Sequence, residues 1–234
     1  MGELLVEVLV QRIITALQKI TDNYEIILVN DGSPDDTWKK IKEISSGNIR
    51  IIGIDLARNY GQHRAIKTGL ENCSGEWDVV MDCDLQDEPE DIVNLYNSIR
   101  ETSDSVFALR MKGNTGAIKR FFSWFFYVVL ELFTGIKFKG RVTNFGIYHN
   151  TLISRAIQIP KKYFFFPLAV RLVSDHSEHL LVNHNPRISG KTSYSFFKAL
   201  NLAFVILAGN SFLSFLLKKR NDKNIIKEII NPAT

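Results

Sequence analysis

The stretch VVMDCDLQDEPEDI, residues 79–92, decides the fold, because it joins an apolar run to a dense group of acids. Val79, Val80 and Met81 are typical of a buried strand. The positions that follow hold the carboxylates of Asp82, Asp84, Asp87, Glu88, Glu90 and Asp91. Carboxylates gathered in one place repel each other unless a positive charge lies among them. The stretch therefore predicts a strand that ends at a site for a cation or another positive group.

Short apolar runs alternate with amphipathic segments on both sides of this strand. Apolar runs stopped by glycine or proline are typical of buried strands, and the segments between them have the length and periodicity of helices. We expect strands at residues 24–31, 49–56, 77–84 and 105–110, and helices at residues 5–20, 33–44, 61–73 and 88–100. This order predicts an α/β fold in which a mostly parallel, Rossmann-like sheet has helices on both faces.

Length and composition indicate one large globular domain, or a domain with an appendage. The 234 residues are 45% hydrophobic and 23% charged, which is ordinary for a packed protein. The net charge of +4 does not choose between a nucleic acid and a membrane as partner. With Cys73 and Cys83 as the two cysteines and no basic segment at the start of the chain, the sequence favours a reducing compartment over a disulfide framework.

The D-x-D pair at the end of the 77–84 strand has the chemistry of a metal site. Ligands of open α/β sheets bind at the carboxyl ends of strands. If the strand continues to residue 84, Asp82 and Asp84 point to one side and Cys83 to the other. Two carboxylates suit Mg²⁺ bound together with substrate phosphates, and Gln86 can add an amide oxygen. We interpret the later acids, Asp87, Glu88, Glu90 and Asp91, as capping the 88–100 helix, where the dipole favours negative charge.

Four motifs in a fixed order make the chain resemble glycosyltransferase family 2. They are YEIILVNDGSPDDT (24–37), ARNYGQHRAIKTGL (57–70), VVMDCDLQDEPEDI (79–92) and GKTSYSF (190–196). The set looks most like the branch of dolichyl-phosphate mannosyltransferase and bacterial polyprenyl-phosphate glycosyltransferases, over residues 22–217. The resemblance implies a GT-A fold, a nucleotide-sugar donor, a Mg²⁺ or Mn²⁺ ion and inversion at the sugar carbon.

The resemblance also assigns roles to residues of this chain by position. It makes Asp84 catalytic, and it gives the metal and diphosphate to Asp82, Asp84 and Gln86. It gives the nucleotide-sugar donor to Asn30, Asp31, Asn59, Tyr60 and Gly61, together with the D-x-D pair. Many relatives have Asp where this chain has Asn30.

The acceptor that the resemblance implies is a polyprenyl phosphate. A lipid phosphate with a second pKa near 6 is largely a dianion at neutral pH, so it needs cations to hold it more than it needs a base. Arg110, at the end of the 105–110 strand, is expected to be catalytic and to bind phosphate. Further candidates for the acceptor phosphate are Lys119, Arg120 and Arg187. For these last three, the alternative is a solvated surface cation.

Two apolar segments raise the question of a membrane. A spanning helix needs about 20 apolar residues, and the runs 121–133 and 202–217 are shorter. Both can lie in the membrane interface, where the basic residues 218–220 would meet anionic head groups, or in the core. We divide the chain into a GT-A-like domain at 1–195 and an apolar juxtamembrane segment with a basic tail at 196–234. The predicted location is the cytoplasmic face of the membrane, in cell-wall or polysaccharide biosynthesis, with no nucleic acid partner.

Two departures from the family pattern keep other functions open. The chain opens directly on the helix that should follow the family's first strand, so we expect a gap beside the 77–84 strand, poor folding alone and weak nucleotide binding. Residues 144–146 are Asn-Phe-Gly, where relatives often carry an acid before Phe and Arg. The alternatives are a transferase with a saccharide acceptor, an impaired family member that binds at the membrane surface, and a metal-dependent nucleotidyltransferase. The histidines of 174–184 could suggest zinc, but a polar surface is favoured.

Overall fold

The structure, a computed structural model, describes residues 2–110, 128, 142–160, 164–183, 185 and 225–232. Its helices are α1 (Gly2–Leu17), α2 (Thr37–Gly47), α3 (Gln62–Leu70), α4 (Asp91–Asn97), α6 (Asn150–Ala156) and α7 (Phe166–Val173). Its strands are β1 (Ile26–Asn30), β2 (Ile51–Leu56), β3 (Trp77–Val80), β4 (Ser105–Arg110), β5 (Val142–His149), β6 (Ser177–Val182) and β7 (Ile226–Ile230). The order confirms the predicted alternation of strands and helices.

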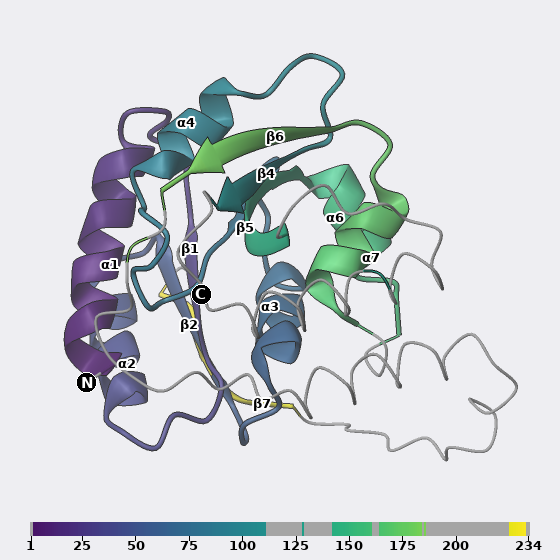
Figure 1. The fold of residues 1–234 in the computed structure, drawn as a ribbon. Coiled ribbons are helices and arrows are strands. Elements are labelled where there is room, and N and C mark those ends of the chain that lie inside the picture. The colour runs from purple at the N-terminus through teal and green to yellow at the C-terminus, as the bar shows by residue number, and fades with distance from the viewer. Residues whose placement is uncertain are drawn as a thin grey trace, which may run out of the picture.

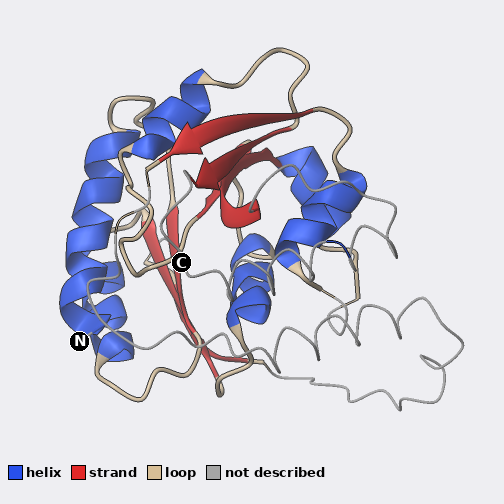
Figure 2. Ribbon diagram, viewed as in Figure 1, coloured by secondary structure: helices blue, strands red, loops and turns tan. Residues whose placement is uncertain are grey.

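The strands lie between two layers of helices (Figure 1). Helices α1, α2 and α4 cover one side, and α3, α6 and α7 cover the other (Figure 2). The short apolar runs form the strands because burial on both faces rewards a continuous apolar sequence. The predicted α/β layering is therefore confirmed, although the strands belong to two sheets and not to one.

The two sheets meet at strands that do not pair with each other. One sheet has the order β1-β2-β7, and the other has the order β3-β5-β4-β6. Strands β1 and β2 are parallel, as are β4 and β6, whereas β7 and β5 run against their neighbours. Within the described part of the chain, β1 pairs with β2 alone and β3 pairs with β5 alone. The break expected beside the 77–84 strand is thus confirmed, while poor folding and weak nucleotide binding stay predictions.

Helix α1 holds the two sheets together along one face. Its first half buries Val6 and Val10 in a cluster with Ile26 of β1 and Ile51 of β2. Its last turn buries Ala16 in a second cluster, which includes strands β4 and β5 and has Val79 and Met81 at its border. Residue Val8 is 49% exposed, so it lies outside the buried face of the helix. The helix therefore joins two cores that the strands alone do not connect.

The C-terminal strand β7 was not predicted, because residues 196–234 were assigned to an apolar juxtamembrane segment and a basic tail. It pairs antiparallel with β2, and Glu228 accepts hydrogen bonds from Trp38 Nε1 at 3.2 Å and Lys42 Nζ at 2.7 Å. These contacts attach β7 to α2 as well as to the sheet. Residues 196–224, which hold the predicted juxtamembrane segment, lie outside the described residues, so the division at residue 195 stays a prediction.

Two predicted element boundaries were wrong. Helix α2 begins at Thr37, so Ser33 and Pro34 lie in the loop before it, and Asp36 is the N-cap. Strand β3 ends at Val80, so strand alternation does not orient the D-x-D pair. The residues SPDD favour a turn, so the loop continues past Pro34 and the helix begins only at Thr37.

Of the later acids, Glu90 and Asp91 lie at the start of helix α4, as the sequence predicted. The N-cap Glu90 makes no side-chain cap hydrogen bond. Its carboxylate instead accepts a bond of 2.9 Å from Arg12 Nε of α1, and the pair is reinforced by a second contact from the same guanidinium. The hydrogen bond from Arg12 lowers the pKa of Glu90. This ion pair joins α1 to the start of α4, where Glu90 has the predicted N-cap position and its side chain binds Arg12.

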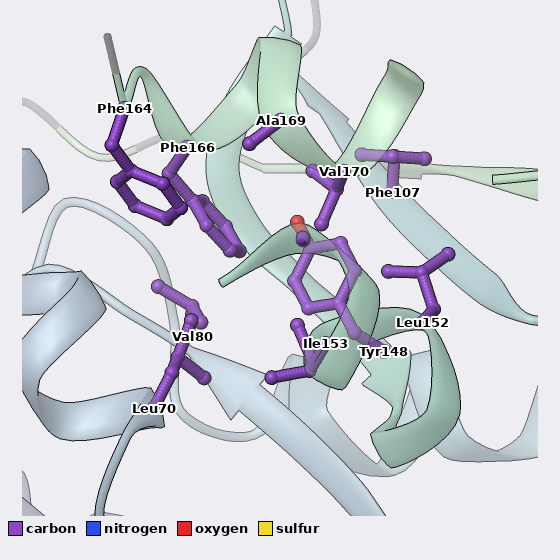
Figure 3. Packing of buried hydrophobic residues seen from close by; sticks show 11 residues of the cluster. Leu70, Val80, Phe107, Tyr148, Leu152, Ile153, Phe164, Phe166, Ala169 and Val170 are labelled. Carbon is purple, nitrogen blue, oxygen red and sulfur yellow. The ribbon is translucent and has the colours of Figure 1, made fainter. Parts of the chain in front are cut away.

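The largest core cluster among the described residues lies between β4, β5, α6 and α7 (Figure 3). Tyr148 is fully buried there, and its ring meets Phe107 at 5.5 Å and Phe166 at 5.2 Å between centroids, both edge to face. The same ring lies over Gly146, where an added Cβ would come within 2.6 Å of the Tyr148 hydroxyl. This close approach explains why position 146 does not carry the large basic residue that the family pattern suggests.

The described helices give no candidate for a membrane crossing, since none combines sufficient length with sufficient apolar character. The apolar runs 121–133 and 202–217 lie outside the described residues, apart from Val128. The expectation that they lie in the membrane interface stays a prediction.

Candidate active site

The carboxyl end of β1 carries a buried polar network. Asn30 donates from Nδ2 to Asp55 Oδ1 of β2 at 2.7 Å, and Asn30 Oδ1 accepts from the backbone N–H of Ser33 at 3.2 Å. Lys227 of β7 donates to the other carboxylate oxygen of Asp55 at 3.1 Å. Asn30 and Asp55 are almost fully buried. Asparagine suits position 30 because an aspartate there would face Asp55 with a second negative charge.

Sequence reasoning missed Asp55 and Lys227. The available signal was a carboxylate inside the apolar run IIGIDL, because a buried charge requires a partner. The partner comes from the C-terminal strand, far away in the sequence, and no local pattern indicates it.

Asp31 holds the turn that the sequence assigned to the donor. Its two carboxylate oxygens accept the backbone N–H groups of Tyr60 at 2.7 Å and Gly61 at 2.8 Å. Burial raises the pKa of Asp31, and these two hydrogen bonds oppose the shift. Gly32, with φ of 65°, lets the loop approach so closely that a Cβ would lie 2.5 Å from the N atom of Asn59. The end of β1 and the 59–61 turn therefore form one unit, as their shared assignment to the donor requires.

The D-x-D pair lies in the turn after β3. Asp82 and Asp84 are half-buried, whereas Cys83 between them is exposed. Gln62 donates from Nε2 to Asp82 Oδ1 at 2.6 Å. Asp84 Oδ1 accepts the backbone N–H of Gln86 at 3.2 Å. That Asp82 and Asp84 point to one side and Cys83 to the other stays a prediction, and strand alternation cannot produce it because β3 ends at Val80.

The turn closes with a reversal of the chain at Leu85. This residue is buried and has φ of 55°, a left-handed conformation that bulky residues adopt rarely. After it, Gln86 makes two hydrogen bonds with the backbone of Asn185. The backbone N–H of Asn185 donates to Gln86 O at 2.9 Å, and the side-chain Nε2 of Gln86 donates to Asn185 O at 3.3 Å. The side-chain amide of Gln86 therefore anchors the chain that follows β6, and its role as a metal ligand stays a prediction.

The residues present fit a divalent metal held together with a diphosphate. No group of three or more His, Cys, Asp and Glu side chains within the described ranges is arranged to hold a metal ion by itself. Mg²⁺ typically uses one or two carboxylates and completes its shell with water and substrate phosphates. Two half-buried aspartates in one turn match that donor set better than they match a zinc site.

The basic side chains predicted to bind the acceptor phosphate lie outside the described residues. Arg110 is the last residue of β4, and its backbone is in register with Val182 of β6. Strands β3 and β4 both run antiparallel to β5, so they point the same way. Arg110 and the D-x-D turn therefore lie at the same end of the sheet. The Arg110 side chain, Lys119, Arg120 and Arg187 lie outside the described residues, and their roles stay predictions.

The histidines of 174–184 have separate partners. Arg171 Nη2 and His179 Nε2 lie 2.5 Å apart, and the His179 ring stacks on Phe107 at 5.8 Å. The backbone N–H of His176 donates to Asp104 at 3.2 Å, and its side chain is exposed. His184 lies outside the described residues. These contacts give no support to a zinc site among the described residues.

His63 lies on the first turn of α3, next to Gln62, with its ring against Phe165. The ring centroids are 4.6 Å apart in an edge-to-face arrangement. Both ring nitrogens are buried, and neither has a hydrogen-bond partner within the described part of the chain. Burial lowers the pKa of His63 from its ordinary value of 6.5 to about 4. The imidazole is therefore neutral in the folded protein at neutral pH.

This burial makes stability depend on pH in a defined window. The unfolded chain takes up the His63 proton near pH 6.5, and the folded chain takes it up only near pH 4, so stability falls as the pH falls between these values. The loss amounts to up to about 3 kcal/mol. The change His63→Phe should remove this slope, measured by urea unfolding at pH 7, 6, 5 and 4. The exposed His176, changed to Gln, should retain the slope of the parent, and an equal slope in His63→Phe would contradict the assignment.

Comparisons with known proteins identify the family of the chain. The model of the family described as Glycosyl transferase family 2 matches residues 4–158. The chain is 29% identical over 200 residues to an undecaprenyl-phosphate 4-deoxy-4-formamido-L-arabinose transferase of Shewanella sediminis, which covers 85% of this chain and 60% of the relative. It is 32% identical over 199 residues to an uncharacterized glycosyltransferase of Synechocystis, with 84% and 62% covered. The chain thus spans about three fifths of the length of these curated relatives.

A solved structure shares the fold. Glucosyl-3-phosphoglycerate synthase from Mycobacterium tuberculosis, in complex with phosphoglyceric acid, superposes with a TM-score of 0.52 at 16% identity. The match covers 84% of this chain and 72% of that chain. At this identity the likeness concerns the fold alone, and it confirms the predicted GT-A architecture.

Proposed function

Because the chain belongs to glycosyl transferase family 2, we propose that it is an inverting glycosyltransferase that moves a sugar from a nucleotide-sugar donor to a polyprenyl phosphate at the membrane surface. The observation that carries this proposal is the set of hydrogen bonds that join three of the sequence motifs in space. Asp31 holds the Tyr60–Gly61 turn, and Gln62, the next residue, holds Asp82 of the D-x-D turn. The names of relatives that act on undecaprenyl phosphate support the choice of acceptor.

In this proposal each part of the site has one task. The residues that would hold Mg²⁺ or Mn²⁺ are Asp82, Asp84 and Gln86, and the metal, when bound, would neutralise charge on the departing nucleoside diphosphate. The ends of β1 and β2, with Asn30 and Asp31, hold the nucleotide side of the donor, and the 59–61 turn closes over it. Arg110, Lys119, Arg120 and Arg187 are assigned to the acceptor phosphate. Catalysis then rests on orientation and charge, because the dianionic phosphate attacks without a strong base.

A saccharide acceptor would need a carboxylate base to remove a hydroxyl proton. Residues 144–146 of β5, where the family pattern has an acid, hold Asn, Phe and Gly. This composition favours the phosphate acceptor over the saccharide. The alternative of an impaired, membrane-binding protein receives its support from the break between β1 and β3, since a nucleotide site at that edge would lack one strand.

We also propose a peripheral location on the cytoplasmic face of the membrane. The division into residues 1–195 and 196–234 assigns membrane contact to the second segment, with the exception of β7, which pairs with the sheet. The apolar run 202–217 and the basic residues 218–220 carry this part of the proposal.

A transfer assay tests the proposed function. The purified chain is incubated with Mg²⁺, a panel of radiolabelled nucleotide sugars, and either undecaprenyl phosphate in detergent or a set of free saccharides. We expect label to enter the lipid phase with one donor, in an acid-labile phosphodiester. Label in the saccharide fraction would favour the saccharide acceptor. Absence of transfer to either acceptor, for a folded protein that still binds the membrane, would favour the impaired binding protein.

A further inference from the structure

The two sheets are connected at the site by a very short piece of chain. Strand β1 ends at Asn30, and Asp31 directly after it holds the Tyr60 and Gly61 N–H groups. Gln62 follows as the first residue of α3, and its side chain contacts the turn after β3. The segment 60–62 therefore spans the break between the sheets, with Asp31 on one side and Asp82 on the other.

Gln62 is well placed to control the orientation of Asp82. Its backbone is fixed at the helix start, because the N–H groups of Arg64 and Ala65 both donate to Gly61 O, at 2.9 and 3.2 Å. The Nε2–Oδ1 distance of 2.6 Å is short for an amide donor and a carboxylate, as expected when the acceptor is charged. A neutral amide orients a carboxylate without cancelling its charge, whereas a lysine or arginine would compete with a cation for it.

We propose that Gln62 is a positioning residue for the metal site, which couples the donor turn to the D-x-D carboxylates. This inference rests on the proposed function, because it requires a metal at Asp82 and Asp84. Side chains that orient a metal ligand typically change metal affinity by about 10- to 100-fold when they are removed. The alternative is that an exposed glutamine makes a surface hydrogen bond with no effect on binding.

Metal binding without turnover distinguishes the two. Mn²⁺ is titrated into the full chain, alone and with pyrophosphate, and the free ion is followed by its electron paramagnetic resonance signal. We expect Gln62→Met, which keeps the length of the side chain and removes its donor, to weaken Mn²⁺ binding by about 10-fold or more. The matched control is Gln18→Met, an exposed glutamine directly after α1. The control should bind Mn²⁺ as the parent does, and thermal unfolding should show that both variants are folded.

A double-mutant cycle with Asp82→Asn tests whether Gln62 acts through Asp82. In that background, Gln62→Met should add less than about a twofold change, since partners of one interaction are not additive. An equal loss in both backgrounds would overturn the proposed route, and unchanged Mn²⁺ binding in Gln62→Met alone would overturn the role of Gln62. If the parent binds no Mn²⁺ with or without pyrophosphate, both the metal site of the proposed function and this inference are wrong. Parent binding with an unaffected variant leaves the proposed function standing.

Discussion

Replacing Asp84 with Asn should lower the rate of sugar transfer by about 10²–10³-fold, the loss expected when one group that stabilises transition-state charge is removed. The change removes a negative charge from the D-x-D turn but keeps an oxygen at the same place. That oxygen can still accept the N–H of Gln86, which Asp84 Oδ1 accepts at 3.2 Å. The turn should therefore remain folded, and the loss should come from weaker metal binding and poorer stabilisation of the leaving diphosphate.

The measurement is the initial rate of lipid-linked sugar formation at saturating donor, over a series of Mg²⁺ concentrations. A surface carboxylate provides the control, because Asp22 is exposed in the loop before β1. Asp22→Asn should transfer sugar at the parent rate. Full activity of Asp84→Asn in metal-depleted buffer would contradict the role of Asp84, and unfolding of the variant would be detected by circular dichroism before any rate is compared.

Replacing Phe166 with Ala should lower the free energy of unfolding by about 3–5 kcal/mol, the usual cost of removing a buried aromatic ring. Phe166 is fully buried at the start of α7, and its ring contacts Tyr148 edge to face. In Figure 3 it lies beside Phe164 and across from Val80, so the cavity would open where α7 meets the sheet. Domains are stable by only about 5–15 kcal/mol, so this loss is a large share of the total.

Urea unfolding followed by circular dichroism measures this effect. The matched control is Leu172→Ala in the same helix, because Leu172 is 52% exposed. It should cost less than about 1 kcal/mol, within the range of surface substitutions. Equal losses in the two variants would show that α7 does not pack against Tyr148 as described.

The sequence by itself determined the kind and order of most elements. The apolar runs before Asp31 and Asp82 had the length and composition of buried strands, and the segments between them had helical periodicity. The motifs also predicted polar residues at the strand ends, and the structure places Asp31 after β1 and Asp82 and Asp84 in the turn after β3. These features are local, since they follow from the alternation of apolar and polar residues within about a dozen positions.

Only the tertiary structure decided how these elements join. Pairing between strands depends on contacts between distant residues, so the sequence could not reveal that β7 would complete one sheet or that Lys227 would neutralise Asp55. Nor could it show that strand β3 stops at Val80, since turn geometry and strand alternation give Asp82 and Asp84 similar spacing. The hydrogen bond from Gln62 to Asp82 has the same origin: it exists because the fold brings the start of α3 against the turn after β3, twenty residues later in the chain.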